Sequence, residues 1–218
     1  VISVNGQAED GHFLFFVTKK GTVKRTTVTA FSNIRANGLI AIGLREGDEL
    51  VNVMSTEGDE TIIIGTHDGY SVTFKEAVVR DMGRTASGVR GIRLRDEDYV
   101  IGSAVLKENQ EVLVITEKGY GKRTKASEYP VKGRGGKGIK TANVKEKNGP
   151  RAGLTTVTGD EDILLITDKG VIIRFNAGSV SQTGRATLGV RLMKMEGNTK
   201  VVTMAIVDKE DEEVEETE

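Results

Sequence analysis

A glycine-rich loop carrying three cations is the first segment of the chain that could do chemistry. It reads Lys132-Gly133-Arg134-Gly135-Gly136-Lys137-Gly138. A nucleotide-binding loop needs Gly-Lys followed by Ser or Thr and a helix, but here Gly138 follows Lys137 and a strand is expected next. Glycines let a phosphodiester backbone approach main-chain N–H groups, while Arg and Lys neutralise phosphates. The loop therefore predicts contact with nucleic acid rather than with a mononucleotide.

Basic residues recur at related places along the chain. One stands four positions before a glycine at Arg84, Arg134 and Arg185, and Arg35 is displaced by one. Others follow the same glycines by two positions, or come after the hairpins described below. Repetition favours a stepped basic rim that binds duplex DNA with little sequence preference. The predicted DNA-binding residues are Lys24, Arg25, Arg35, Arg84, Arg90, Lys122, Arg123, Lys132, Arg134, Lys137, Lys140, Arg174, Arg185 and Arg191.

Catalytic constellations are sparse in this sequence. Cysteine is absent, and His12 and His67 are the only histidines, without metal-ligand spacing. No Gly-x-Ser-x-Gly elbow occurs, and the acidic residues fall in turns. We expect both histidines to be surface residues, and we expect no metal, no cofactor and no enzymatic activity within this chain.

Charge divides the chain into a basic body and an acidic end. The formal net charge of the 218 residues is −1. Residues 208–218 hold eight acids and one lysine, which leaves 30 basic and 24 acidic residues in 1–207, a net of +6. Such a division suggests a polyanion-binding body with a disordered acidic tail. Without a long apolar run or a signal-peptide pattern, we expect a cytoplasmic protein that does not associate with membranes.

A repeat of about fifty residues must position these cations. Thr-x-x-Gly occurs four times, beginning at Thr18, Thr66, Thr116 and Thr167. Each copy lies between two β-rich runs, as in the turn of a hairpin. The four hairpins are predicted to start near residues 13, 61, 112 and 163.

Each repeat continues in the same order after its hairpin. An apolar anchor (Phe31, Val79, Tyr129 or Val180) comes first, then a second glycine (Gly38, Gly88, Gly138 or Gly189) that opens an alternating strand, and then a closing strand. At the second position after that glycine stand Ile40, Arg90, Lys140 and Arg191, and we expect the basic members to face outward.

Four strands per repeat and no helical period predict an all-β, propeller-like array of four blades in residues 1–207. Val1 to Val4 duplicates a closing strand without a hairpin before it, which suggests a cut in a longer array. A complete four-bladed ring is the alternative.

Several motifs in order resemble one family. Thr116 to Thr124 (TEKGYGKRT), Gly135-Gly136-Lys137-Gly138 and Gly83 to Gly88 (GRTASG) are similar to the C-terminal domain of the DNA gyrase A protein, over essentially the whole chain. The resemblance implies a β-pinwheel, a propeller in which neighbouring blades exchange strands, usually with six blades. It also implies a rim that wraps duplex DNA, so that the ATP-dependent holoenzyme of gyrase A and gyrase B proteins can introduce negative supercoils.

One motif departs from the family pattern. The family's signature box reads Gln-Arg-Arg-Gly-Gly-Arg/Lys-Gly, whereas Lys132 and Gly133 replace its first two residues here. This motif resembles the degenerate copy of a later blade, and counting repeats backward from the acidic tail makes the four repeats resemble blades three to six of a longer domain. The resemblance implies that the catalytic sites of the family lie in other domains or subunits, so no catalytic residue can be carried over. Two alternatives stay open: the corresponding C-terminal domain of topoisomerase IV, and a propeller scaffold that binds proteins but not nucleic acid.

Overall fold

The computed structural model describes residues 11–34 and 37–207 of the chain. Within these ranges the regular elements are fifteen β-strands and four short 3-10 helices, and α-helices do not occur. The prediction of an all-β fold is therefore confirmed.

Four antiparallel hairpins form the repeated body of the fold. Their turns are the four Thr-x-x-Gly segments, in which the glycine adopts a positive φ, for example +82° at Gly21. An L-residue with a side chain is strained in that conformation, which explains the glycine. The hairpins are β1 (Phe13–Thr18) with β2 (Thr22–Thr27), β4 (Thr61–Thr66) with β5 (Tyr70–Lys75), β8 (Glu111–Thr116) with β9 (Tyr120–Lys125), and β12 (Asp162–Thr167) with β13 (Ile172–Asn176).

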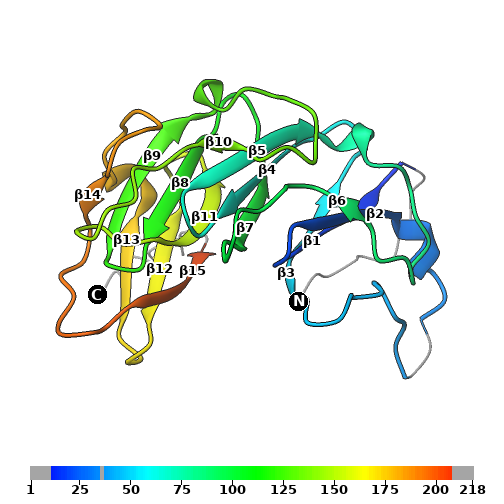
Figure 1. The fold of residues 1–218 in the computed structure, drawn as a ribbon, viewed down its shortest axis with the longest axis horizontal. Coiled ribbons are helices and arrows are strands. Elements are labelled where there is room, and N and C mark those ends of the chain that lie inside the picture. Colours follow the sequence, from blue (N-terminus) through cyan, green and yellow to red (C-terminus); the bar gives the residue numbers. More distant parts are fainter. Residues whose placement is uncertain (1–10, 35–36, 208–218) are drawn as a thin grey trace, which may run out of the picture.

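A closing strand pairs with the first strand of each hairpin. These strands contact one another from sheet to sheet, with Asn52 Nδ2 donating to the Ser103 carbonyl over 2.8 Å. They lie along the inner side of the arc in Figure 1. The closing strands are β3 (Leu50–Thr56), β7 (Val100–Val105), β11 (Arg151–Val157) and β15 (Val201–Val207).

The outer strand of three sheets comes from the following repeat. It is only two residues long in each case: β6 (Val89–Arg90) joins β2, β10 (Ile139–Lys140) joins β5, and β14 (Val190–Arg191) joins β9. The sheet orders are β3-β1-β2-β6, β10-β5-β4-β7, β11-β8-β9-β14 and β13-β12-β15. Neighbouring blades are therefore interlocked by strand exchange.

In the first repeat the expected strand after Gly38 does not form. Residues 39–44 have no regular structure, and Ile40 is 65% exposed. Strand exchange supplies the physical reason, since this segment would have to pair with a hairpin of a preceding repeat. The described residues contain none.

Apolar side chains fill the spaces between the four sheets. Phe15 and Val23 of the first sheet pack against Ile62 and Phe74 of the second, and equivalent clusters join the later sheets. Figure 1 shows the sheets following one another along an arc from the N-terminal repeat to the C-terminal repeat. The core is thus built from interfaces between blades, so the array folds as one interlocked series.

A 3-10 turn follows each hairpin and holds the predicted apolar anchor in or beside it. Val79, Tyr129 and Val180 are buried, whereas Phe31 is half-buried. These turns lie at the end of each hairpin opposite its Thr-x-x-Gly turn. They are η1 (Val28–Phe31), η2 (Glu76–Val78), η3 (Ala126–Glu128) and η4 (Ala177–Ser179).

Three features of the sequence analysis lie outside the described residues: the segment Val1 to Val4, Arg35, and the acidic tail 208–218. The described part of the chain contains no helix that is long and apolar enough to cross a membrane.

Candidate nucleic-acid interface

The exchanged strands display one cation each at the same register. Arg90 pairs with Thr22, Lys140 with Tyr70 and Arg191 with Tyr120. All three basic side chains are exposed, as the alternation of the sequence predicted. The array therefore carries a cation at an equivalent place on each of three successive sheets.

The glycine that opens each exchanged strand permits its close approach to the hairpin. Gly138 has φ +73°, and a Cβ atom there would lie 2.7 Å from the Ser71 carbonyl oxygen. Gly189 has φ +83° and a similar distance, 2.7 Å, to the Gly121 oxygen. A side chain would be strained on both counts. These glycines set the position of the cation two residues further on.

Two arginines of the preceding loops donate to the repeat before them, and one of them, Arg134, contacts an exchanged strand. Arg84 Nη1 donates to the Ile40 carbonyl over 3.2 Å, and Arg134 Nη1 donates to the Arg90 carbonyl over 3.1 Å. Arg134 is exposed, Arg84 is half-buried, and Arg185 is half-buried with its main-chain N–H on Glu128. Arg134 thus lies beside Arg90, the strand cation of the repeat before it.

The glycine-rich loop uses part of its main chain internally. The N–H of Lys132 donates to Thr73 over 2.7 Å, and the N–H of Gly135 donates to Gly91 over 2.6 Å. The expectation that the loop offers its N–H groups to a phosphate is therefore wrong for these two. Its side chains remain available, because Lys132, Arg134 and Lys137 are exposed.

Two predicted contact residues are buried. Lys24 has no exposed surface, and its Nζ donates to the carbonyls of Ala41, over 2.6 Å, and Arg84. Lys122 is 2% exposed, and its Nζ donates to the carbonyls of Gly184, Arg185 and Thr187. The structure contradicts the predicted outward position of both lysines. Each lysine connects its own hairpin to a loop of the next repeat by hydrogen bonds.

Burial also changes the proton affinity of these two amines. Burial, with the positive charge of Arg84, lowers the pKa of Lys24 to about 8. Burial, with the charge of Arg151, lowers the pKa of Lys122 to about 8 despite the opposing effect of Glu128.

Three further cations from the predicted set are paired with carboxylates. Arg25 is buried and contacts Asp81 at 2.6 Å and Glu76 at 3.6 Å. Arg174 is exposed and contacts Asp162 at 2.8 Å. Their charges are neutralised locally, so they fit a structural role better than phosphate contact.

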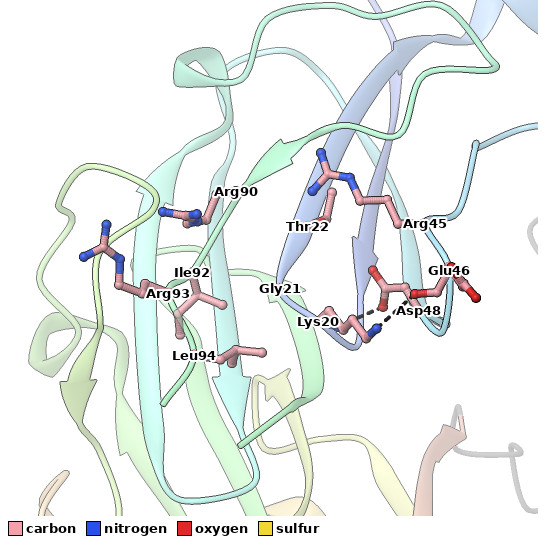
Figure 2. A pocket seen from close by; sticks show the side chains of 10 residues that line it. All are labelled: Lys20, Gly21, Thr22, Arg45, Glu46, Asp48, Arg90, Ile92, Arg93 and Leu94. Atoms are coloured by element: carbon pink, nitrogen blue, oxygen red, sulfur yellow. Dashed lines mark hydrogen bonds between the residues drawn. The ribbon is translucent and has the colours of Figure 1, made fainter. Parts of the chain in front are cut away.

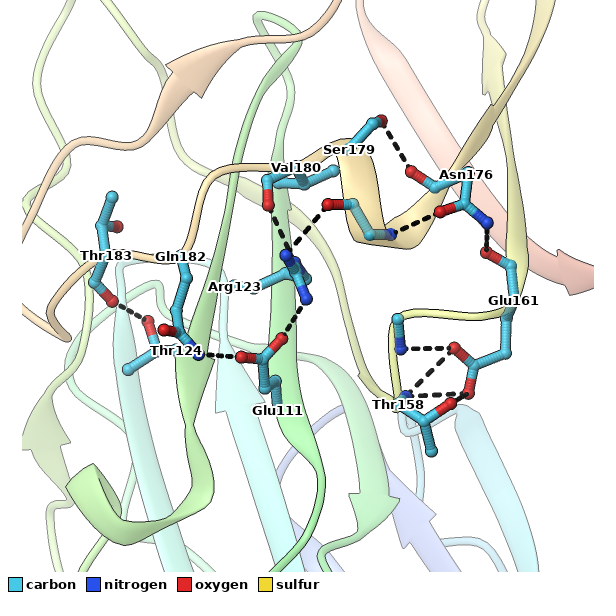
Figure 3. Close-up of polar contacts among 12 residues, drawn as sticks. Glu111, Arg123, Thr124, Thr158, Glu161, Asn176, Ser179, Val180, Gln182 and Thr183 are labelled. Atoms are coloured by element: carbon cyan, nitrogen blue, oxygen red, sulfur yellow. Dashed lines mark hydrogen bonds and ion pairs between the residues drawn. The ribbon is translucent and has the colours of Figure 1, made fainter.

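Arg123, the third of these cations, pairs with a carboxylate and also donates to two main-chain carbonyls. Figure 3 shows its guanidinium between the Glu111 carboxylate and the turn that follows β13. Nε donates to the Val180 carbonyl over 2.8 Å, and Nη2 donates to the Gly178 carbonyl over 3.0 Å. Arg123 therefore joins the third and fourth repeats.

A cationic pocket that sequence reasoning missed lies between the first two repeats. It has a volume of about 550 Å³ and is lined in part by Lys20, Arg45, Arg90 and Arg93. Figure 2 shows Arg90 and Arg93 on one side and Arg45 and Lys20 on the other. One signal was present in the sequence, because a basic residue follows the second glycine by seven positions at Arg45, Arg95 and Lys145.

The fold and these cations define the class of protein: a propeller-like array of β-sheets that exchange strands, in which each exchanged strand carries an exposed positive charge.

The family follows from comparison with known proteins. A family model described as DNA gyrase C-terminal domain, beta-propeller, matches residues 12–57, 60–107, 110–154 and 161–208. The chain therefore belongs to the DNA gyrase C-terminal domain family.

Relatives that are DNA gyrase A proteins support this membership. The chain is 66% identical to that of Streptococcus pyogenes serotype M3 over 216 residues, which is 99% of this chain. It is 60% identical to that of Streptococcus pneumoniae serotype 4, over 97% of this chain, and 58% identical to that of Halalkalibacterium halodurans, over all of it. The chain spans 26% of the length of these relatives.

Solved structures show the same architecture. A DNA gyrase A C-terminal domain matches with a TM-score of 0.82 and 27% identity, over 92% of this chain and 67% of that one. The C-terminal domain of DNA topoisomerase IV matches with a TM-score of 0.88 and 26% identity, over 94% and 64%. The two families share the fold, so the sequence similarity carries the assignment to gyrase.

Proposed function

We propose that this chain binds duplex DNA along its exchanged strands and the loops before them, through phosphate contacts that do not read sequence. The observation that carries the proposal is the equivalent, exposed position of Arg90, Lys140 and Arg191 on three successive sheets. Exposed cations of the adjacent loop, Lys132, Arg134 and Lys137, extend the same surface. Phosphates lie at regular intervals along a duplex, so a repeated cation suits a backbone contact.

Sequence-tolerant binding follows from the kind of element that carries the charge. Base edges are read most often by a helix or a long β-ribbon in the major groove. The described residues contain no α-helix, and the exchanged strands are two residues long. Contacts to phosphate and sugar are what such short strands and their loops can reach.

Bending is the second part of the proposal. The cations follow an arc of sheets, so a duplex that contacts several of them must curve (Figure 1). Bending a site of about 20–30 base pairs by 40–90° costs on the order of 1–6 kcal/mol, which the distributed contacts offset. In the complete gyrase, such a curved duplex would let the ATP-dependent holoenzyme introduce negative supercoils. The chemistry of strand cleavage and ATP hydrolysis belongs to other parts of that assembly.

The proposed partners are duplex DNA, the remainder of the gyrase A protein, and the gyrase B protein. We also propose that the chain acts in the cytoplasm; its similarity to DNA gyrase A proteins supports this proposal.

A salt-titrated binding measurement tests the proposal. With fluorescently labelled duplexes of two unrelated sequences, we expect similar affinities and a steep fall as salt rises. If six cations contact phosphates, the affinity should fall about 10³-fold between roughly 50 and 200 mM salt. A slope near zero, or no binding at low salt, would overturn the proposal and favour a propeller scaffold that binds proteins.

A further inference from the structure

The hairpin turn of the second repeat departs from the other three in its charge. The third residue of Thr-x-x-Gly is Lys20, Lys118 and Lys169 in the first, third and fourth repeats, but Asp68 in the second. Lys20 Nζ donates to the Glu46 carbonyl over 3.0 Å, and Lys118 Nζ donates to the equivalent carbonyl, that of Glu146. A fixed ammonium therefore sits over this turn in two repeats. In the second repeat the residue at this sequence position is acidic, Asp68.

Around Asp68 the chain gathers further ligand atoms. Three side chains each offer one atom that could bind a metal ion, and these atoms lie within 4.8 Å of one another: His67, Asp68 and Asp98. His67 Nδ1 lies 3.0 Å from Asp68 Oδ1, and Tyr99 stacks on the imidazole with ring centroids 4.6 Å apart. The His67 ring is thus held in place by packing as well as by its polar neighbours.

Asp98 supplies a second, independent observation. The residue is only 7% exposed, and Oδ1 accepts from the N–H groups of Asp68, over 3.0 Å, and Tyr99, over 2.9 Å. Oδ2 is buried and has no hydrogen-bond partner among the residues that the structure describes. Native structures rarely leave a buried carboxylate oxygen without a partner. A bound cation would supply one for Oδ2.

The imidazole of His67 lies between two carboxylates, those of Asp68 and Glu117. Glu117 Oε1 lies 3.2 Å from His67 Nε2 and can accept its proton. A neutral imidazole with its proton on Nε2 has only a lone pair on Nδ1, which then faces the lone pairs of Asp68 Oδ1. The buried guanidinium of Arg151 is close enough for its charge to act on Asp98. Its hydrogen bonds go to the Tyr70 carbonyl and to the hydroxyls of Ser71 and Thr141, and none joins it to Asp98 Oδ2 among the described residues.

We propose that His67 Nδ1, the Asp68 carboxylate and Asp98 Oδ2 form a site for a divalent metal ion. One imidazole and two carboxylates suit Mn²⁺ or Zn²⁺ better than Ca²⁺ or Mg²⁺, which prefer oxygen ligands alone. Glu117 orients the imidazole from behind, in the usual pairing of a carboxylate with a metal-bound histidine. Lys200 holds Glu117 in turn, at 3.5 Å.

The metal would act on the junction between repeats. His67 and Asp98 belong to the second repeat, whereas Glu117 and Lys200 belong to the third and fourth. A bound ion would bring positive charge to a turn whose counterparts carry a lysine in place of Asp68, and it would fix the histidine that contacts Glu117 of the third repeat. The expectation of a plain surface role for His67 rested on the lack of metal-ligand spacing between the two histidines, and the other ligands here are carboxylates.

Direct titration of the chain with Mn²⁺ or Zn²⁺ alone tests the site. We expect one equivalent to bind and to raise the thermal unfolding temperature. The variant Asp68→Lys, which restores the residue of the other turns, and Asp98→Asn should each weaken this binding at least tenfold. Glu117→Gln should weaken it by roughly 10–100-fold, as is typical for a residue that orients a ligand.

Asp48→Asn is the matched control. Asp48 occupies the equivalent position in the first repeat, where Oδ1 accepts from Lys20, over 2.9 Å, and Glu49, over 2.8 Å. This variant should alter the turn but keep the metal affinity. Acidic residues of 208–218 could also attract metal, but their contribution is the same in every variant.

Two results would overturn the proposal. One is equal metal affinity in the Asp68→Lys variant, the Asp98→Asn variant and the unchanged chain. The other is the absence of any binding of Mn²⁺ or Zn²⁺ to the unchanged chain, with no change in its thermal unfolding temperature.

Discussion

The guanidinium of Arg134 donates to the main-chain carbonyl of Arg90 over 3.1 Å, although the two residues belong to different repeats. This contact places the side chain of a loop cation against the strand that carries another. A second bond, from Nε to the Val78 carbonyl at 3.3 Å, holds the same side chain in position. The cations of the candidate interface are therefore positioned by contacts between repeats.

Removing the three strand cations should weaken DNA binding without unfolding the chain. In the variant Arg90→Gln with Lys140→Gln and Arg191→Gln, we expect the slope of log affinity against log salt to become shallower by about 0.9 per lost contact. All DNA sequences should be affected alike. Lys107→Gln is the control, because Lys107 is exposed in the loop before β8, at the end of that strand away from its hairpin turn. An unchanged slope in the triple variant would remove these strands from the interface.

Neutralising the loop should affect binding more than stability. Arg134→Ala with Lys137→Ala should reduce DNA affinity at every sequence, while the unfolding free energy falls by less than about 1 kcal/mol, since water can replace donors at exposed carbonyls. Ile115→Ala is the comparison, because Ile115 is fully buried and its truncation should cost about 2–5 kcal/mol. A stability loss of that size in the loop variant would mean that the loop is structural.

A side chain at Gly138 should displace the strand that carries Lys140. Gly138→Ala places a Cβ at φ +73° and 2.7 Å from the Ser71 oxygen, so we expect a loss of about 1–3 kcal/mol together with weaker DNA binding. Gly136→Ala is the matched control, because a Cβ there meets nothing within 4 Å. Urea unfolding of the two variants gives the comparison. Equal stabilities would show that the exchanged strand tolerates the shift.

The buried Glu76 should be essential to the first junction. Its carboxylate accepts from Thr56 Oγ1 over 2.7 Å and from the N–H groups of Gly58 and Glu60, and it contacts Arg25 at 3.6 Å. Glu76→Gln should lower the unfolding free energy by about 1–3 kcal/mol, because the amide NH₂ of glutamine cannot accept the hydrogen bonds that one of the two carboxylate oxygens accepts. Glu57→Gln, at an exposed position, should change it little. Similar losses in both variants would contradict this role.

Stability should rise with pH between about 8 and 10. The pKa of Lys24 and that of Lys122 are both lowered to about 8 in the folded chain, against about 10.4 in an unfolded one. In this window the unfolded chain binds more protons, so raising the pH favours the folded state. Above pH 10 two buried groups act in opposite directions. Burial raises the pKa of Tyr129, which lowers the stability as the pH rises. Burial lowers the pKa of Arg151 to about 10, which raises the stability in the same range.

Urea unfolding across pH 7 to 11, measured on the double variant Lys24→Met with Lys122→Met, assigns this effect. We expect the rising segment to disappear in the double variant, and to persist in Lys107→Met, where the exposed amine has no such environment. A rising segment of the same size in the double variant would mean that other groups cause it.

Local patterns were enough to predict the repeated elements. The Thr-x-x-Gly turn and the alternation around it depend on residues within one hairpin, so the four hairpins and their closing strands could be located from the sequence. The same alternation placed Arg90, Lys140 and Arg191 on the outward side of their strands. Where a property depends on φ and on strand period alone, neighbours along the chain determine it.

The tertiary structure alone decided which cations are available. Lys24 follows its hairpin glycine as Lys122 does, and both look like surface lysines beside a basic neighbour. Each is covered by a loop of the next repeat, about sixty residues away, whose carbonyls take the hydrogen bonds of the amine. Strand period determines which side of a sheet a residue faces. Whether that side meets solvent or another segment depends on packing between repeats, which no local pattern contains.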